Sequence, residues 1–326
     1  MILDCTLRDG AHVNKGYFGK ENIHIIVKSL IQSKVDYIEV GFVENCIYDE
    51  HRSFFPDLES AEKFCSNFDF NNFSVMIRSD RLEFEKLNYK SDSISLVRIA
   101  FYPENIERVV KYTKRLNDLG YEVFLNPINI TAYKSQEYND LLTKIINLDI
   151  KGVALVDTFG ALSFKSFYEY LDVLKAQINN NSEIKIGLHL HENTNLSLGL
   201  IESVFSKYDK EDFIVDASLF GMGRIPGNLH LENIMTYYNV NFKFNYNLRP
   251  VLKVIEDVIF LEYEKRKWGY SPIYMYAGHN NIHRTYAEYM KEELGLSFDK
   301  IFDVLNLLKD SHNKYEFNKE YLLSKI

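Results

Sequence analysis

The chain has few cysteines, a single tryptophan and no long apolar run. Its three cysteines, Cys5, Cys46 and Cys65, are odd in number and show no CxxC spacing. The sequence therefore predicts neither a disulfide framework nor a structural zinc knuckle, and reduced thiols are expected. No stretch approaches the ~18 consecutive apolar residues that a membrane-spanning helix needs.

Basic residues are also in deficit. There are 38 Lys and Arg against 46 Asp and Glu, which gives a net charge of −8. This balance argues against a general binder of nucleic acid or of anionic membranes. A strand predicted from residue 2 onward leaves no room for a signal peptide, so we expect a cytoplasmic protein.

Short apolar runs rich in β-branched residues recur along the first two thirds of the chain. The predicted strands are Ile2–Leu7, Tyr37–Val43, Phe73–Ile77, Ile94–Phe101, Glu122–Leu125, Gly152–Val156, Ile184–Leu190 and Phe213–Ala217. Segments with helical spacing separate them, and this alternation indicates parallel strands with right-handed crossovers. Eight such units predict a (β/α)8 TIM barrel.

The clearest helical segment follows Pro103. Its apolar residues are predicted to share one helical face, and Gly120 stands where a C′ glycine would end the helix. These apolar residues are Ile106, Val109, Val110, Leu116 and Leu119.

An open, doubly wound sheet is the alternative fold. It would need a phosphate-binding GxGxxG turn after the first strand, and none is present there. From about Phe242 the patterns are helical only, over Arg249–Lys267, His283–Leu294 and Phe298–Leu308. We therefore predict a barrel domain at residues 1–241 and a C-terminal helical domain at 242–326.

Nearly every predicted strand ends in polar or charged residues. In a barrel, catalytic residues gather at these carboxyl ends, whereas a single polar residue at a loop start is ordinary. The set as a whole predicts an active site and consists of Arg8, Asp9, His12, Glu39, Arg78, Arg98, Asn126, Asp157, Thr158, His189, His191 and Asp216.

His189 and His191 are two residues apart at the end of one predicted strand. Residues i and i+2 of a strand face the same side, so both imidazoles can reach one ion. Alone, such a pair could equally be two surface or capped histidines. With Asp9 it predicts a divalent-metal site open to substrate, suited to Mn²⁺, Mg²⁺, Zn²⁺ or Fe²⁺. Non-haem iron oxygenases use the same ligand types, so an oxygenase is an alternative.

Arg8 adjoins Asp9 and would lie beside the ion. A fixed guanidinium there could stabilise an oxyanion or enolate. The other interpretation is a structural ion pair with Glu39, and both can hold at once.

Five motifs together resemble the pyruvate carboxyltransferase-like, or DRE-TIM metallolyase, superfamily. They are Leu3-Asp-Cys-Thr-Leu-Arg-Asp-Gly10, Tyr37-Ile-Glu-Val-Gly41, Val156-Asp-Thr158, Leu188-His-Leu-His191 and Asp216-Ala-Ser-Leu-Phe-Gly-Met-Gly-Arg-Ile-Pro-Gly-Asn228. The resemblance covers roughly residues 2–235. Within the superfamily it favours the 4-hydroxy-2-oxovalerate aldolases, which carry a histidine at the position of His12. The loop that holds a catalytic cysteine in the CoA lyases has none here.

The resemblance implies a metal-dependent aldolase, a lyase that cleaves or forms a 4-hydroxy-2-oxo acid through a metal-bound pyruvate enolate. Asp9, His189 and His191 would hold the metal. His12 would be the base, Arg8 and Glu39 catalytic partners, and Tyr270, or failing it Tyr274, an acid–base partner. Asn126, Thr158 and Asn228 would bind substrate. Arg78 and Arg98 would receive an anionic second substrate or form ordinary barrel ion pairs.

We expect Mn²⁺ or Mg²⁺ at the site, with Zn²⁺ or Co²⁺ as alternatives. The expected small molecules are a 2-oxo acid and an aldehyde. A homodimer, or docking to an aldehyde dehydrogenase through the C-terminal helices, is the expected assembly. The main alternative function is an acyl-CoA-dependent Claisen synthase or CoA lyase on the same barrel. A binding or scaffolding protein is a more distant one.

Overall fold

Eight parallel strands close into a barrel in the computed structural model, which describes residues 1–178 and 183–326. Closure comes from β1, which pairs with β9 on one side and with β2 on the other. The barrel strands are β1 (Ile2–Asp4), β2 (Tyr37–Val43), β4 (Phe73–Arg78), β5 (Ile94–Phe101), β6 (Glu122–Pro127), β7 (Gly152–Val156), β8 (Lys185–His189) and β9 (Phe213–Ala217). The predicted (β/α)8 barrel is confirmed.

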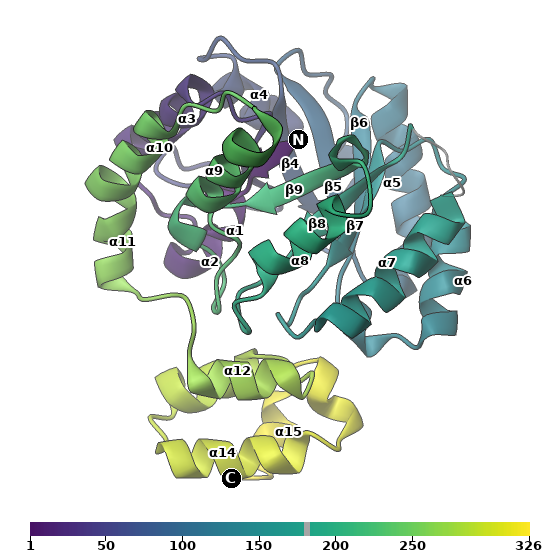
Figure 1. Cartoon of the computed structure of the whole chain (residues 1–326), viewed down its shortest axis with the longest axis vertical. Helices are drawn as coiled ribbons and strands as arrows, with labels where there is room; N and C mark the ends of the chain where they lie inside the picture. Colours follow the sequence, from purple (N-terminus) through teal and green to yellow (C-terminus); the bar gives the residue numbers. More distant parts are fainter. Residues whose placement is uncertain (179–182) are drawn as a thin grey trace.

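Helices cover the outside of the barrel (Figure 1). The β4–β5 connection carries only a short 3₁₀ turn, η1 (Phe84–Lys86), among its described residues. The surrounding helices are α3 (Lys20–Gln32), α4 (Leu58–Cys65), α5 (Ile106–Asp118), α6 (Ser135–Ile145), α7 (Phe164–Ile178), α8 (Ser197–Phe205) and α9 (Leu231–Phe242).

An additional strand of two residues, β3 (Phe54–Phe55), pairs with β2 outside the barrel. It was not predicted, because two residues are too short to give a recognisable alternation. In α5, Val109 and Leu116 are buried as predicted, and Gly120 ends the helix with φ +87°. Val110 is 39% exposed, so its predicted place on the buried face was wrong. Successive residues of an α-helix are about 100° apart around its axis, so Val110 points away from the face that buries Val109.

The first strand is shorter than the predicted Ile2–Leu7. It ends at Asp4, and Thr6–Asp9 forms a helical turn, α1, followed by α2 (Ala11–Asn14). The reason is local: the Asp4 carboxylate accepts hydrogen bonds from the Thr6 backbone N–H (3.0 Å) and the Thr6 hydroxyl (2.7 Å). Such a side-chain bond to the backbone competes with strand extension and turns the chain.

The barrel interior has an apolar floor with a polar layer above it. On β2, Tyr37 belongs to the apolar floor and Glu39, two residues later, to the polar layer. On β5, Leu96 and Arg98 are related in the same way. Phe124 fills the floor because Gly152 and Gly187 leave room for its ring, where an added Cβ would lie within 2.8 Å of a ring carbon. The strand period of two therefore places the polar side chains at one end of the barrel.

The C-terminal helices pack in two places. The predicted helix Arg249–Lys267 is α10 (Leu248–Val254), the π-helical η6 (Ile255–Ile259) and α11 (Phe260–Lys265), and apolar residues of α10 and η6 belong to the barrel core. Residues 272–323, here called the C-terminal module, form a second core. The module lies to one side of the barrel beyond the segment that follows α11 (Figure 1). It contains α12 (Pro272–His279), α13 (Thr285–Glu288), η7 (Tyr289–Glu293), α14 (Phe298–Leu308) and α15 (Lys319–Leu323).

The predicted domain boundary at 241/242 stays a prediction. None of the helices in the described part of the chain is long and apolar enough to cross a membrane.

Two leucines of α14 test the second core. Leu305 is fully buried and Leu307 is 60% exposed. Leu305→Ala should lower the free energy of unfolding by about 2–5 kcal/mol, because it removes buried methyl groups and leaves a cavity. Leu307→Ala should change it by less than about 0.5 kcal/mol. Equal shifts of the two variants in denaturant unfolding would contradict this packing.

Candidate active site

The polar ends of the strands open into one cavity of about 540 Å³. Barrel strands contribute Asn126 and His189 to its lining, and α1 and α2 contribute Arg8, Asp9 and His12. The C-terminal module contributes His283 and Arg284. Chemistry-bearing side chains from distant parts of the sequence therefore share one concave site.

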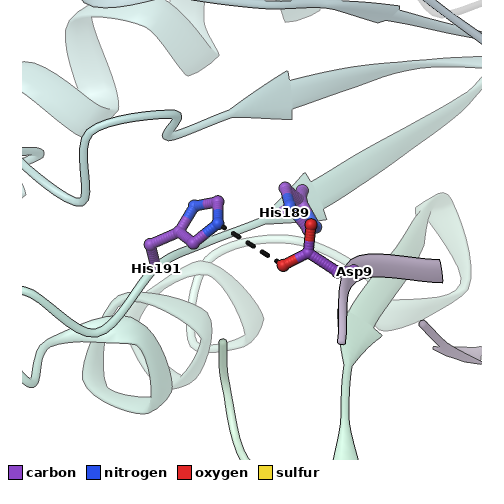
Figure 2. Close-up of side chains that lie close together, drawn as sticks. All are labelled: Asp9, His189 and His191. Carbon is purple, nitrogen blue, oxygen red and sulfur yellow. Dashed lines mark ion pairs between the residues drawn. The ribbon is translucent and has the colours of Figure 1, made fainter. Parts of the chain in front are cut away.

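Asp9, His189 and His191 are the described residues that could hold a metal ion. One ligand atom from each lies within 4.8 Å of the others, and all three side chains are buried. Figure 2 shows the Asp9 carboxylate facing both imidazoles, with 3.8 Å between its Oδ2 and His191 Nε2. Two imidazoles and a carboxylate suit a divalent ion and leave coordination positions for substrate.

Groups behind the predicted metal ligands orient both imidazoles. Asp216 Oδ2 lies 2.9 Å from His189 Nδ1, and the Asp157 carbonyl oxygen lies 2.8 Å from His191 Nδ1. These groups lie on the Nδ1 side of the two rings, which favours Nε2 as the ligand atom. Desolvation lowers the pKa of His189, so this imidazole is neutral as a metal ligand must be.

Asp9 is held as a carboxylate from two sides. Burial would raise its pKa, but the Arg8 guanidinium together with the His191 and His12 imidazoles outweighs burial and holds the pKa well below the usual range. Asn228 Nδ2 donates to Asp9 Oδ2 at 2.7 Å. Asn228 thus positions the predicted ligand, and the described residues fit the divalent ion that the sequence predicts.

Arg8 forms the ion pair with Glu39 that was considered from sequence, and its role toward an oxyanion stays a prediction. Its Nε donates to Glu39 Oε2 and its Nη1 to Asp9 Oδ1, each at 2.6 Å. Its buried Nη2 has no hydrogen-bond partner among the described residues. An unpaired buried donor at a cavity wall is suited to an anionic oxygen of a substrate.

Arg98 and Arg78 are engaged within the protein. Arg98 is fully buried in the barrel and bridges Glu39 and Asp216. Arg78 lines the cavity but forms a two-point ion pair with Asp80. Both therefore form ion pairs in this structure, Arg98 inside the barrel and Arg78 with the turn that follows β4.

His12 stands at the cavity wall on α2. Its Nε2 is 4.0 Å from Asp9 Oδ1, and its ring meets the Phe42 ring edge-on. Desolvation and the Arg224 guanidinium lower the pKa of His12. The neutral imidazole can accept a proton at neutral pH.

The remaining predicted residues divide into two groups. Asn126 and Thr158 line the cavity, and Thr158 Oγ1 also accepts the Asn129 backbone N–H at 2.8 Å. Tyr270 is 55% exposed and does not line the cavity, and Tyr274 is buried in the second core. The structure therefore does not bring either tyrosine to the other predicted site residues, and a catalytic tyrosine stays a prediction.

Sequence reasoning missed several cavity residues. They come from loops and from the C-terminal module, where no periodic pattern predicts orientation. These residues are Lys15, Arg52, Arg81, Tyr102, Arg224, His283 and Arg284. Only Arg224 lies within one of the five motifs, which would have been a signal for it.

Comparisons with known proteins find chains of similar sequence and fold. A family model described as HMGL-like matches residues 98–258. An oxaloacetate decarboxylase from Mycobacterium tuberculosis is 21% identical over 71% of this chain and 68% of its own length. A 4-hydroxy-2-oxovalerate aldolase from Geobacillus genomosp. 3 is 25% identical over the same two shares, 71% and 68%.

A solved structure is also similar. It is the N-terminal domain of a Bacteroides vulgatus protein described as a candidate aldolase, 27% identical with a TM-score of 0.75. The match covers 92% of this chain and 98% of that one.

Loss of one ligand should weaken metal binding. Asp9→Asn or His191→Ala is expected to reduce Mn²⁺ affinity by at least roughly tenfold in titration calorimetry, because a site of three protein ligands loses a donor. His279→Ala, which changes an exposed histidine of α12, is the matched control and should bind Mn²⁺ as the unaltered protein does. Unchanged affinity in both ligand variants would show that the ion binds elsewhere.

Proposed function

From the match of residues 98–258 to the HMGL-like family model and the similarity to a 4-hydroxy-2-oxovalerate aldolase, we infer that the chain belongs to the HMGL-like family of lyases and aldolases, within the DRE-TIM metallolyase superfamily. From this premise we propose that it is a divalent-metal-dependent aldolase that cleaves or forms a 4-hydroxy-2-oxo acid, with pyruvate as one of the small molecules. The observation that carries the proposal is the position of His12. A neutral imidazole shares one cavity with the Asp9, His189 and His191 cluster and with the unpaired Arg8 Nη2.

A divalent ion, Mn²⁺ or Mg²⁺ by preference, would be held by Asp9, His189 and His191 and would supply Lewis acidity toward the 2-oxo acid. Glu39 fixes the Arg8 guanidinium through the bond to Nε, so Nη2 is oriented before substrate binds. Preorganised donors of this kind favour the transition state because they need little rearrangement.

In the cleavage direction His12 takes the proton from the C4 hydroxyl. The C3–C4 bond breaks, an aldehyde carbonyl forms at C4, and the electron pair of the broken bond passes into the pyruvate enolate. Arg8 Nη2 donates to the anionic oxygen of this enolate. Protonation at C3 by water then gives the methyl group of pyruvate. Asn126 and Thr158 are the proposed substrate hydrogen-bonding groups at the cavity wall. Condensation is the same sequence reversed.

An acyl-CoA-dependent Claisen synthase or CoA lyase is the alternative. The loop that follows β9, at 219–224, contains no cysteine, whereas the resemblance places the catalytic cysteine of CoA lyases there. Dependence of turnover on acetyl-CoA would favour the alternative. Pyruvate loss with aldehyde alone would favour the aldolase.

The His12 variant separates aldol chemistry from enolate formation. His12→Ala should lower kcat for aldol cleavage by about 10²–10⁴-fold, the usual contribution of a general base. Metal-dependent exchange of the pyruvate methyl protons and decarboxylation of oxaloacetate should persist, because neither needs a hydroxyl proton to be removed. Asp9→Asn should abolish all three reactions. If His12→Ala lowers them all equally, His12 is not the base.

A further inference from the structure

The candidate active site is strongly basic within an acidic protein. The chain carries a net charge of −8, yet seven Lys and Arg side chains line the cavity against two carboxylates. A 2-oxo acid needs only one of these cations for its own carboxylate. The excess indicates a ligand with further negative charge.

Some of these cations are already neutralised by the protein. Arg8 is paired with Glu39 and Asp9, and Arg78 is paired with Asp80. The charges of these two arginines are therefore balanced without an anion from the ligand.

Arg224 and Arg284 differ in this respect. Within the described residues neither forms an ion pair with a carboxylate. Arg284 donates from Nη1 to the Ile225 carbonyl oxygen (3.1 Å), and Arg224 donates from Nη2 to Thr285 Oγ1 (3.4 Å). Arg284 is only 9% exposed. Glu288 lines a smaller neighbouring cavity with both arginines but is ion-paired with Arg266. Burial of a cation with no carboxylate at ion-pair distance is costly, so the site is suited to an anion that arrives with the ligand.

The two arginines lie on the His12 side of the site. Arg224, Arg284 and His12 line the main cavity and also line a neighbouring cavity of about 120 Å³. In the proposed reaction His12 faces the C4 hydroxyl, which belongs to the aldehyde half of the substrate. A substituent beyond C4 would therefore extend toward the two guanidinium groups.

We propose that the acceptor aldehyde carries an anionic group, a phosphate or a second carboxylate, which Arg224 and Arg284 bind. This assignment rests on the proposed aldolase function and names its substrate class. Guanidinium groups bind both oxyanions through paired N–H donors. Arg284 belongs to the C-terminal module, so the module contributes to substrate selection while the barrel carries the chemistry.

Paired aldehydes test the proposal with pyruvate and Mn²⁺. Glyceraldehyde 3-phosphate is compared with glyceraldehyde, and succinic semialdehyde with butanal. At least one charged acceptor should exceed its neutral counterpart in kcat/KM by roughly 10- to 100-fold, the effect of hydrogen bonds to a charged group. The phosphate and carboxylate pairs distinguish the two anion sources. Equal kcat/KM within both pairs would overturn the proposal.

Variants of the two arginines test whether they cause the preference for a charged acceptor. Arg224→Gln and Arg284→Gln should each lower the ratio of kcat/KM for the charged acceptor to kcat/KM for its neutral counterpart by roughly 10- to 100-fold. The neutral acceptor also reports on folding, and Arg224→Gln is available if the buried Arg284 variant does not fold. Arg249→Gln removes an exposed charge on α10, outside both cavities, and should change neither value. Equal losses for both acceptors would overturn the assignment.

Failure of the two proposals can be told apart by exchange of the pyruvate methyl protons with solvent. If the protons exchange but charged acceptors are not preferred, the assignment of an anionic acceptor is overturned and the proposed aldolase function is not. Absence of both exchange and aldol turnover would overturn the proposed function and the acceptor assignment with it. Turnover that depends on acetyl-CoA and is lost in Arg224→Gln would assign the arginines to an acyl-CoA instead.

Discussion

A continuous chain of buried charges crosses the barrel and connects the two sides of the candidate metal cluster. Its charged members alternate in sign, in the order Asp9, Arg8, Glu39, Arg98 and Asp216, and Asp216 contacts the neutral His189 imidazole at the far end. Taking such groups out of water is expensive, and the arrangement is stable only while every member is present. The orientation of Arg8, the ionised state of Asp9 and the orientation of His189 all depend on this chain.

The C-terminal module completes a site that the barrel leaves open. Gly278 lies so near the barrel that an added Cβ would be 2.5 Å from the Phe159 carbonyl oxygen, and Asn129 Nδ2 donates to the Tyr315 carbonyl oxygen at 3.4 Å. These contacts bring His283 and Arg284 to the cavity wall. In the proposed function the barrel supplies the groups for enolate chemistry, and the module supplies groups that bind the acceptor.

Much of the fold and of the metal cluster could be predicted from the sequence, because both depend on local periodicity. The step from His189 to His191 puts both imidazoles on one side of a strand end, whatever surrounds them. The extent of the first strand was mispredicted because the Asp4–Thr6 bonds replace strand pairing after three residues. The position of Tyr270 could not be read from any pattern, since it lies in the irregular segment that connects α11 to the C-terminal module.

The sequence by itself determined the barrel and the ligand types of its metal cluster, and its motifs indicated the superfamily. These features follow from strand period and from residue identity at strand ends. Only the tertiary structure decided which of the described cations remain without a carboxylate partner. Arg98 and Arg284 are both buried arginines, yet Arg98 contacts two carboxylates and Arg284 contacts a carbonyl oxygen. That difference arises from contacts between residues far apart in the chain, which no local pattern encodes.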